Sequence, residues 1–191
     1  GKLTLGFNNI AAYAQFDARY PSASRFVDED MNRVWAEERL SGNDHSLEVA
    51  RAREIRPLID TVDFLLDLHS MQSASPPLML AGPLQKGREF AGQLHYPETI
   101  MCDAGHAAGK RLRDYGDFGD PNSPRNALLL EAGQHWAASS AIVSTDSAVC
   151  FLQALDMIDL ATAETLLRDV KPAIQRTIEV LDRITIESDD F

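Results

Sequence analysis

Two polar residues each follow an apolar run of the 191-residue sequence, where a side chain is well placed to do chemistry. His69 follows residues 62–68, a nearly continuous apolar stretch, and Glu131 follows residues 128–130. A histidine held at the end of a buried strand can serve as a metal ligand or a general base. A carboxylate in such a place is costly to bury unless it is paired or takes part in a reaction. Both residues are therefore candidates for an active site.

A third stretch, residues 25–33, combines cationic and amide side chains. Arg25 and Arg33 each present a planar guanidinium that can bind a carboxylate through two hydrogen bonds. Asn32 adds a hydrogen-bond donor and an acceptor. Read alone, such a charged cluster is typical of a solvated surface loop. The stretch therefore gains weight only together with the histidine and the glutamate.

The elements that must position these side chains alternate between strand and helix patterns. Strands are predicted at residues 3–7, 62–68, 77–81 and 127–130, with a short last one at 184–186. Helices are predicted at 44–62, capped by Asp44 and kinked or broken at Pro57, and along apolar stripes at 148–158 and 166–181. This order predicts one α/β domain with a mainly parallel or mixed central sheet flanked by helices. Ligands bind beyond the carboxyl ends of the strands in such a sheet, where His69 and Glu131 are expected to lie.

Composition narrows the class of protein. The chain has 18 Lys and Arg against 29 Asp and Glu, a net charge of −11, and this excess of negative charge argues against a nucleic-acid partner. No apolar run reaches the length of a membrane span, and the opening residues are not a signal peptide. Two cysteines, Cys102 and Cys150, form no Cys-x-x-Cys pair and no disulfide framework. We therefore expect a cytoplasmic protein with reduced thiols and no membrane partner.

Taken together, the polar stretches occur in a recognisable order: Arg25, then residues 30–33 (Asp-Met-Asn-Arg), 67–70 (Asp-Leu-His-Ser) and 131–134 (Glu-Ala-Gly-Gln). This order resembles the succinylglutamate desuccinylase/aspartoacylase family and, more distantly, the zinc carboxypeptidases. The resemblance covers most of residues 1–140. It implies a zinc-carboxypeptidase-like three-layer sandwich. It also implies zinc-dependent hydrolysis of an amide bond in a small N-acyl amino acid or a similar carboxylate substrate.

The resemblance also implies a role for each of the five residues. His69 is similar to the family's downstream zinc ligand. Glu131 is similar to its general base, which takes a proton from zinc-bound water and later protonates the leaving amine. Arg25 resembles the arginine that stabilises the oxyanion. Asn32 and Arg33 resemble the pair that binds the substrate's free carboxylate. We expect His69, Glu131, Asn32 and Arg33 to converge on one cleft.

Four further residues are candidates for supporting roles. Asp30 is expected to orient the neighbouring arginine and asparagine side chains. Arg113 or Arg125 could supply another carboxylate contact, and the sequence does not choose between them. His135 is close enough to Glu131 in sequence to support it, whereas His106 is expected to be a loop residue.

The sequence departs from the family pattern at the metal site. The family's other two zinc ligands come from a His-x-x-Glu loop upstream of the Asp-x-Asn-Arg motif, and no histidine precedes Arg33 here. Two later strings, at residues 45–48 and 95–98, fit His-x-x-Glu but lie on the wrong side of the motif. We therefore expect a piece of a longer enzyme, or a natural truncated relative. Residues 1–183 would form an N-terminally incomplete catalytic domain, and 184–191 the start of a truncated C-terminal β region or a tail.

Two other functions stay open. One is a zinc-carboxypeptidase-like peptidase that removes C-terminal residues from peptides. The other is a non-catalytic α/β fragment that keeps the scaffold and the Asn-Arg loop as a binding module. With one histidine ligand, zinc is expected to bind weakly or not at all. The expected partner is a small carboxylate, and homo-oligomerisation is left open.

Overall fold

The computed structural model describes residues 1–169 and 174–182. The chain divides into two compact units. The first comprises residues 1–67 and 105–129, and the second the described residues of 68–104 and 130–191. Strands β1 (Phe64–Met71) and β4 (Asn126–Gln134) each begin in the first unit and end in the second.

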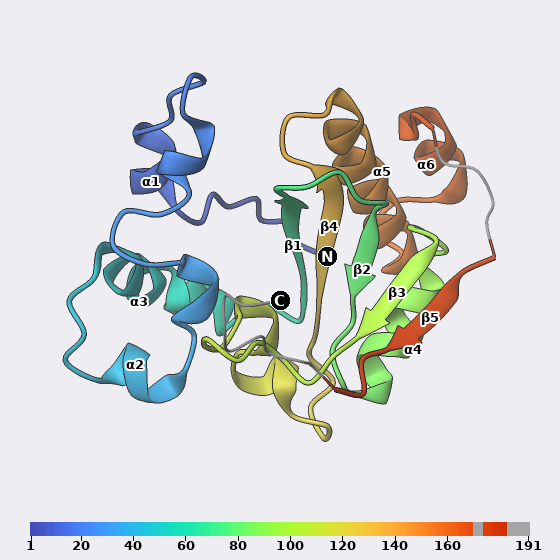
Figure 1. Ribbon diagram of the computed structural model, residues 1–191. Coiled ribbons are helices and arrows are strands. Elements are labelled where there is room, and N and C mark those ends of the chain that lie inside the picture. The colour runs from blue at the N-terminus through green and yellow to red at the C-terminus, as the bar shows by residue number, and fades with distance from the viewer. Residues whose placement is uncertain (170–173, 183–191) are drawn as a thin grey trace. The chain divides into compact units, whose positions relative to one another are not determined.

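In the part of the chain that the structure describes, five strands form one mixed sheet in the order β1-β4-β2-β3-β5. The remaining strands are β2 (Leu78–Leu80), β3 (Thr99–Cys102) and β5 (Arg176–Glu179). β2 pairs with β3 in parallel, and β3 pairs with β5 in parallel. The arrows of β1 and β4 point one way in Figure 1 and those of the other three strands point the other way. The predicted α/β class with a parallel or mixed sheet is confirmed.

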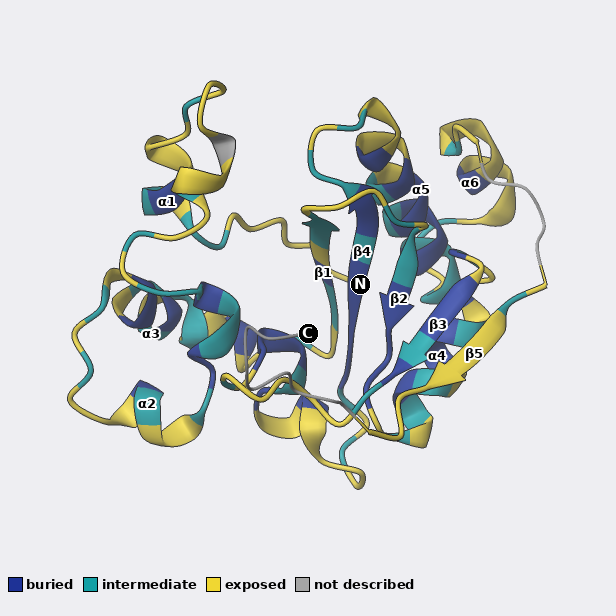
Figure 2. Cartoon of the chain, viewed as in Figure 1, coloured by how far each residue is buried: buried dark blue, intermediate teal, exposed yellow. Residues whose placement is uncertain are grey.

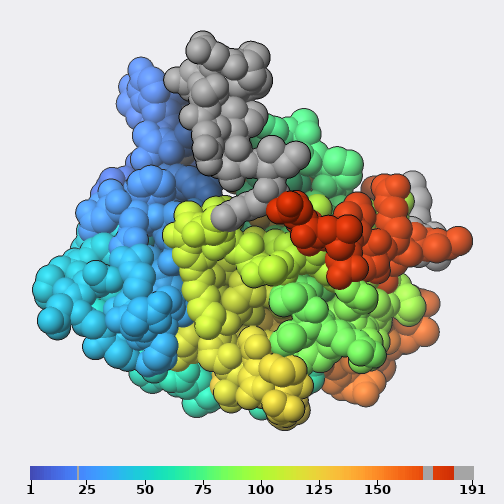
Figure 3. Space-filling view, turned by 60° about the horizontal axis from the view of Figure 1, so that its bottom comes forward, coloured from blue at the N-terminus to red at the C-terminus, as the bar shows by residue number. Residues whose placement is uncertain are grey.

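β4 is the most buried strand because it lies inside the sheet and is apolar on both faces (Figure 2). Leu128, Leu129 and Leu130 are at most 1% exposed. Helices α4 (Gln85–Gln93), α5 (Ala138–Ala154) and α6 (Leu160–Leu166) accompany the strands in the second unit. The rings of Phe90 and Phe151 lie 5.5 Å apart between α4 and α5. All four residues of β5 are exposed, and Figure 3 shows this strand, in red, at the surface.

The first unit has its own apolar core around the fully buried Trp35. The helices of this unit are α1 (Ile10–Ala14), α2 (Glu37–Ser41) and α3 (Leu47–Ile59), and short 3-10 helices connect parts of it. The core residues are Met31, Val34, Trp35, Leu40, Val49, Ala52, Ile59, Leu112, Tyr115, Phe118 and Ala127. No helix of the described residues is long and apolar enough to cross a membrane.

Three of the predicted strands are present with shifted ends. Residues 62–68, 77–81 and 127–130 correspond to β1, β2 and β4. The strand predicted at residues 3–7 is wrong, because this segment is extended coil whose apolar side chains are exposed. Alternation alone does not make a strand when no neighbour supplies hydrogen bonds. The strand predicted at 184–186 lies outside the described residues.

The helix predicted at 44–62 exists, but its details differ. The N-cap is Ser46, whose side chain accepts a hydrogen bond from the Val49 amide at 3.1 Å, and not Asp44. Asp44 instead accepts a hydrogen bond from Arg39 Nε at 2.7 Å. Pro57 lies inside the last turn of α3, which continues to Ile59. A proline so near a helix end removes one hydrogen bond without ending the helix.

The C-terminal stretch is where the sequence prediction fails most. α5 begins at Ala138 and ends at Ala154, so residues 155–158 of the predicted stripe lie beyond it. The helix predicted at 166–181 is wrong, because α6 stops at Leu166 and residues 176–179 form β5. Apolar residues spaced by four, as here, suit both a helix and one face of a strand. α4 and β3 were not predicted at all.

Candidate active site

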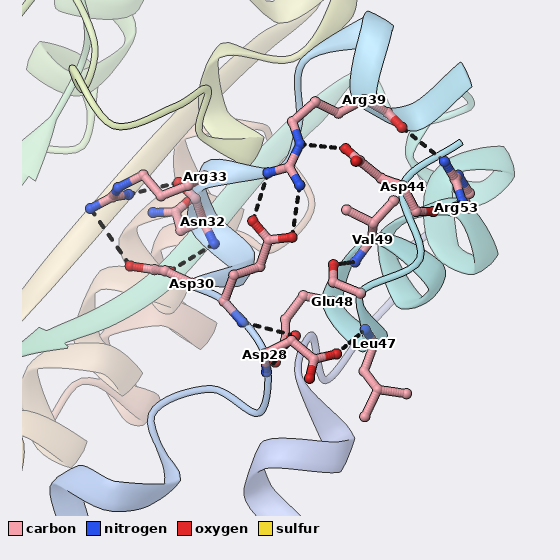
Figure 4. Close-up of polar contacts among 12 residues, drawn as sticks. Asp28, Asp30, Asn32, Arg33, Arg39, Asp44, Leu47, Glu48, Val49 and Arg53 are labelled. Carbon is pink, nitrogen blue, oxygen red and sulfur yellow. Dashed lines mark hydrogen bonds and ion pairs between the residues drawn. The ribbon is translucent and has the colours of Figure 1, made fainter. Parts of the chain in front are cut away.

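Asp30 holds three of the five predicted site residues together in the first unit. Figure 4 shows its contacts with Asn32 and Arg33. Its Oδ2 accepts a hydrogen bond from Arg25 Nη2 at 2.9 Å and lies 3.7 Å from Arg33 Nη2. Its Oδ1 accepts a hydrogen bond from the backbone amide of Asn32 at 2.9 Å. One carboxylate thus fixes Arg25, Asn32 and Arg33 relative to one another. We call these four residues the Asp30 cluster.

Asn32 and Arg33 lie on the 3-10 helix Met31–Arg33, which Asp30 caps and which Met31 anchors in the core of the first unit. Arg33 Nη1 donates to the Asn32 carbonyl oxygen at 2.6 Å, and Asn32 Oδ1 accepts from the Leu112 amide at 3.2 Å. The Asn32 Nδ2 group has no hydrogen-bond partner among the described residues. The amide of Asn32 is therefore oriented by its oxygen and presents its donor side.

The charge balance of the Asp30 cluster favours an anion. Burial would raise the pKa of Asp30, but the hydrogen bonds from Arg25 and the Asn32 amide and the charge of Arg33 hold that pKa below its ordinary value of 3.8. Asp30 is therefore ionised at neutral pH. Counted over these four residues alone, two guanidinium groups and one carboxylate sum to one net positive charge. Together with the Asn32 donor, this is the chemistry that binds a carboxylate.

His69 and Glu131 lie in the second unit, inside β1 and β4 and not at the strand ends predicted for them. β1 continues to Met71 and β4 to Gln134. The ends of both strands are defined by the hydrogen bond from the His135 amide to the Met71 carbonyl oxygen, at 2.8 Å.

The pairing of β1 with β4 places Glu131 opposite His69. The bond from the Asn126 amide to the Asp63 carbonyl oxygen, at 2.9 Å, sets residue 126 opposite 64 in a parallel ladder. The bond from His135 to Met71 sets 135 opposite 72, so β4 contains one extra residue between these two points. Gly133, whose φ is +114°, supplies the backbone geometry for such a bulge. Because the bulge follows Glu131, the carboxylate and the imidazole lie side by side on one face of the sheet.

His135 belongs to the opposite face of the sheet. Its Nδ1 lies 2.7 Å from Ser70 Oγ, and its ring packs edge-on against Trp136 at 5.8 Å. Ser70 follows His69 in β1, so its side chain points away from the face that carries His69. A spacing of four would put His135 on the same face as Glu131 in a regular strand, but the bulge reverses it. The suggestion that His135 supports Glu131 therefore gives way to a role in joining the ends of β1 and β4.

The two candidates for a further carboxylate contact are both occupied. Arg125 donates to the carbonyl oxygens of Val62 and Ile59 at 2.7 and 2.6 Å, and its guanidinium lies 4.8 Å from the Phe118 ring centroid. Arg113 is 3% exposed and pairs with Asp114. Arg125 closes the end of α3, and Arg113 is part of the interior of the first unit.

The described residues do not assemble a zinc site. No group of three or more His, Cys, Asp or Glu side chains within residues 1–169 and 174–182 could hold a metal ion. The later His-x-x-Glu strings do not supply one either. Glu48 is engaged by backbone amides, and Glu98 lies 3.3 Å from Arg176. His69 therefore stands as a single candidate ligand.

The mixed sheet flanked by helices is the fold of the zinc-carboxypeptidase-like desuccinylases and aspartoacylases. The sequence matches the family described as the succinylglutamate desuccinylase/aspartoacylase catalytic domain over residues 2–153. The chain therefore belongs to the succinylglutamate desuccinylase/aspartoacylase family, a family of hydrolases. A search of curated protein sequences finds no match.

Solved structures share the fold at low sequence identity. A succinylglutamate desuccinylase/aspartoacylase from Rhodobacter sphaeroides has a TM-score of 0.61 and 13% identity, over 84% of this chain and 48% of that one. A protein of the same description from Shewanella frigidimarina has a TM-score of 0.63 and 11% identity, over 91% and 57%. Murine aminoacylase 3 has a TM-score of 0.55 and 23% identity, over 81% and 52%. The chain spans about half the length of the solved structures it matches.

Proposed function

We propose that the chain is the part of a deacylase that recognises the carboxylate of a small N-acyl amino acid and helps to hydrolyse its amide bond. The observation that carries this proposal is the Asp30 cluster, in which two arginines and an asparagine are held around one partly buried carboxylate. The family of the chain supports the reaction class. The names of its structural relatives, succinylglutamate desuccinylase among them, suggest the substrate class.

Within the Asp30 cluster the proposed roles follow from position. Asn32 and Arg33 bind the free carboxylate of the substrate, because Arg33 is 18% exposed and Asn32 presents its Nδ2 donor. Arg25 is more exposed, at 46%, and is proposed to stabilise the oxyanion that forms on the acyl carbon. Asp30 holds Arg25, Asn32 and Arg33 in fixed positions relative to one another.

In the second unit, Glu131 is the proposed general base. It takes a proton from the attacking water and returns it to the leaving amine. His69, beside it on the same face of the sheet, is the proposed metal ligand. Zinc, when bound, would polarise the carbonyl and make water more acidic. Because the described residues do not provide three ligands, no step of the reaction is assigned to the metal.

The test is the release of free amine from a panel of N-acyl amino acids, succinylglutamate included, with and without added zinc. Each substrate is paired with its carboxyl-amide analogue. In the longer enzyme of which the chain is proposed to be a part, hydrolysis is expected for the acids and is expected to fall strongly for the amides, because the amides offer the Asp30 cluster no charge. Equal hydrolysis of acids and amides would contradict the assigned carboxylate site. Release of C-terminal residues from peptides would favour the carboxypeptidase alternative. No hydrolysis by a zinc-loaded protein would favour the non-catalytic binding module.

A further inference from the structure

Glu48 is a fully buried carboxylate with four hydrogen-bond donors around it. Its Oε1 accepts from the Val27 amide at 2.7 Å and from Asn9 Nδ2 at 3.0 Å. Its Oε2 accepts from the amides of Asp28 and Glu29 at 3.1 and 3.3 Å. A glutamate on a helix therefore collects three consecutive amides of a segment about twenty residues upstream.

Residues 27–29 and the start of α3 are joined by hydrogen bonds from each to the other (Figure 4). Asp28 Oδ2, on the upstream segment, accepts a hydrogen bond from the Leu47 amide at 2.7 Å. Leu47 is the first residue of α3, whose amide has no partner within the helix. Glu48 thus holds the segment against the helix, and Asp28 holds the helix against the segment.

The segment is also fixed on its other side. Glu29 accepts hydrogen bonds from Arg39 Nη1 and Nη2 at 2.6 and 2.7 Å. Arg39 in turn donates from Nε to Asp44 at 2.7 Å. The next residue along the chain is Asp30. The backbone that precedes the Asp30 cluster is therefore held residue by residue from Val27 to Glu29.

The charge of Glu48 is a part of this arrangement. Burial would raise its pKa, but the hydrogen bonds from Val27, Asn9, Asp28 and Glu29 hold that pKa below the ordinary value of 4.5. Two carboxylate oxygens offer about four acceptor sites, and four donors occupy them. Glu48 is consequently neither a metal ligand paired with His45 nor a base. Its available chemistry is to fix the backbone.

We propose that Glu48 is a positioning residue for carboxylate recognition: its buried carboxylate sets the path of residues 27–29 and so places Asp30, Asn32 and Arg33. This inference rests on the proposed function for the identity of the ligand. The effect of Glu48 on the path of residues 27–29 does not depend on which ligand binds. No pattern around Glu48 in the sequence marks this role, because the groups it binds are far away along the chain.

The first experiment measures the loop itself. Glu48→Gln keeps the size of the side chain but turns an NH₂ group toward backbone donors that need an acceptor. Amide hydrogen exchange of residues 27–33 is then compared with that of the unchanged chain. We expect exchange at Asn32 and Arg33 to accelerate by about tenfold or more, because local opening sets exchange rates. The matched control is Tyr115→Phe, which removes the 2.7 Å bond to Asp60 elsewhere in the first unit. Exchange at Asn32 and Arg33 no faster in Glu48→Gln than in Tyr115→Phe would overturn the inference.

The second experiment measures recognition, with N-acetylglycine as the probe in calorimetric titrations. Arg33→Ala and Glu48→Gln should both weaken binding by about tenfold or more, and Tyr115→Phe should leave it unchanged. If Arg33→Ala weakens binding and Glu48→Gln does not, the inference fails while the carboxylate site stands. If Arg33→Ala has no effect, the proposed carboxylate site fails, and the exchange measurement still decides whether Glu48 controls the loop.

A milder variant guards against misfolding. Should Glu48→Gln not fold, Asp28→Ala removes only the reciprocal bond to the Leu47 amide. It should accelerate exchange at Asn32 and Arg33 in the same direction by a smaller factor. Unchanged exchange in Asp28→Ala, with Glu48→Gln unfolded, would count against the proposal, because residues 27–29 would then keep their path without the bond between Asp28 and the Leu47 amide.

Discussion

The positions of Glu131 and His69 are determined by the two strands that carry them, β4 and β1. Both were picked out as polar residues after apolar runs, and both lie in neighbouring strands of the second unit. The apolar runs were sufficient to find the strands. Their ends were not predictable, because β1 and β4 continue through polar residues that hydrogen-bond to each other's backbone.

The role proposed for Glu131 leads to a kinetic prediction. Glu131→Gln keeps the shape and hydrogen bonding of the side chain but cannot take a proton. In the active enzyme kcat should fall by about 10²–10⁴-fold, the usual contribution of a general base. KM should change little, because Asn32 and Arg33 are proposed to bind the substrate. Metal content is measured beside the kinetics. Loss of zinc would make Glu131 a ligand, and full activity would place the base elsewhere.

The residues around Asp30 were visible in the sequence, but Glu48 was not. Arg25, Asp30, Asn32 and Arg33 fall within nine residues, so their types and spacing suggest one another. Glu48 acts on amides that any residue would supply. Nothing in the side chains of residues 27–29 indicates that their backbone binds a distant carboxylate. Roles of this kind come from the folded structure.

Helix α3 connects residues 27–29 to the core of the first unit. Val49 and Ala52 on its buried face are fully inaccessible, and Glu48 shares that face. Helix patterning located α3 correctly because its apolar positions recur at helical spacing. The sequence did not locate α4 or β3, whose short apolar runs lack clear periodicity.

A stability prediction follows for α3. Ser46→Ala removes the N-cap acceptor for the Val49 amide and should lower the free energy of unfolding by about 1 kcal/mol. Chemical denaturation of the unchanged and substituted chains measures this difference. Ser41→Ala, at the end of α2, is the control and should stay within about 0.5 kcal/mol. A Ser46→Ala chain as stable as the control would show that solvent replaces the cap.

For the whole molecule, the net charge of −11 coexists with carboxylates that the fold stabilises in their ionised form. The pKa values of Asp30 and Glu48 lie below the ordinary values of 3.8 and 4.5. Between those lowered values and the ordinary ones, the unfolded chain binds more protons than the folded chain.

The contribution of Asp30 and Glu48 to the free energy of unfolding should therefore be fully present above about pH 4.5, where both carboxylates are ionised in the folded and the unfolded chain. This contribution should be lost as the pH falls through their pKa values in the folded chain. Denaturation at a series of pH values between 7 and 3 measures the loss. Glu48→Gln should flatten the curve, since one of the responsible groups no longer titrates. An equally steep curve in this variant would show that Glu48 does not contribute.

Zinc binding is the second prediction for the whole chain. Calorimetric titration should find weak binding or none, because no group of three possible ligands lies within residues 1–169 and 174–182, and three are needed for a firm site. Submicromolar, stoichiometric binding that His69→Ala abolishes would contradict this prediction. It would mean that other side chains complete the site.

Gly133 is the residue at which β4 bulges, and this bulge decides which face of the sheet carries His135. Its φ of +114° suits glycine, and a Cβ there would lie 3.2 Å from Ser140 Oγ. Because side chains alternate along a regular strand, a substitution of Gly133 that flattens the bulge would turn His135, four residues after Glu131, to the other face of the sheet. His135 would leave Ser70 and move to the face of Glu131. A change in the gene of one codon, with no chemical group of the site removed, would thus add a second imidazole beside the proposed base.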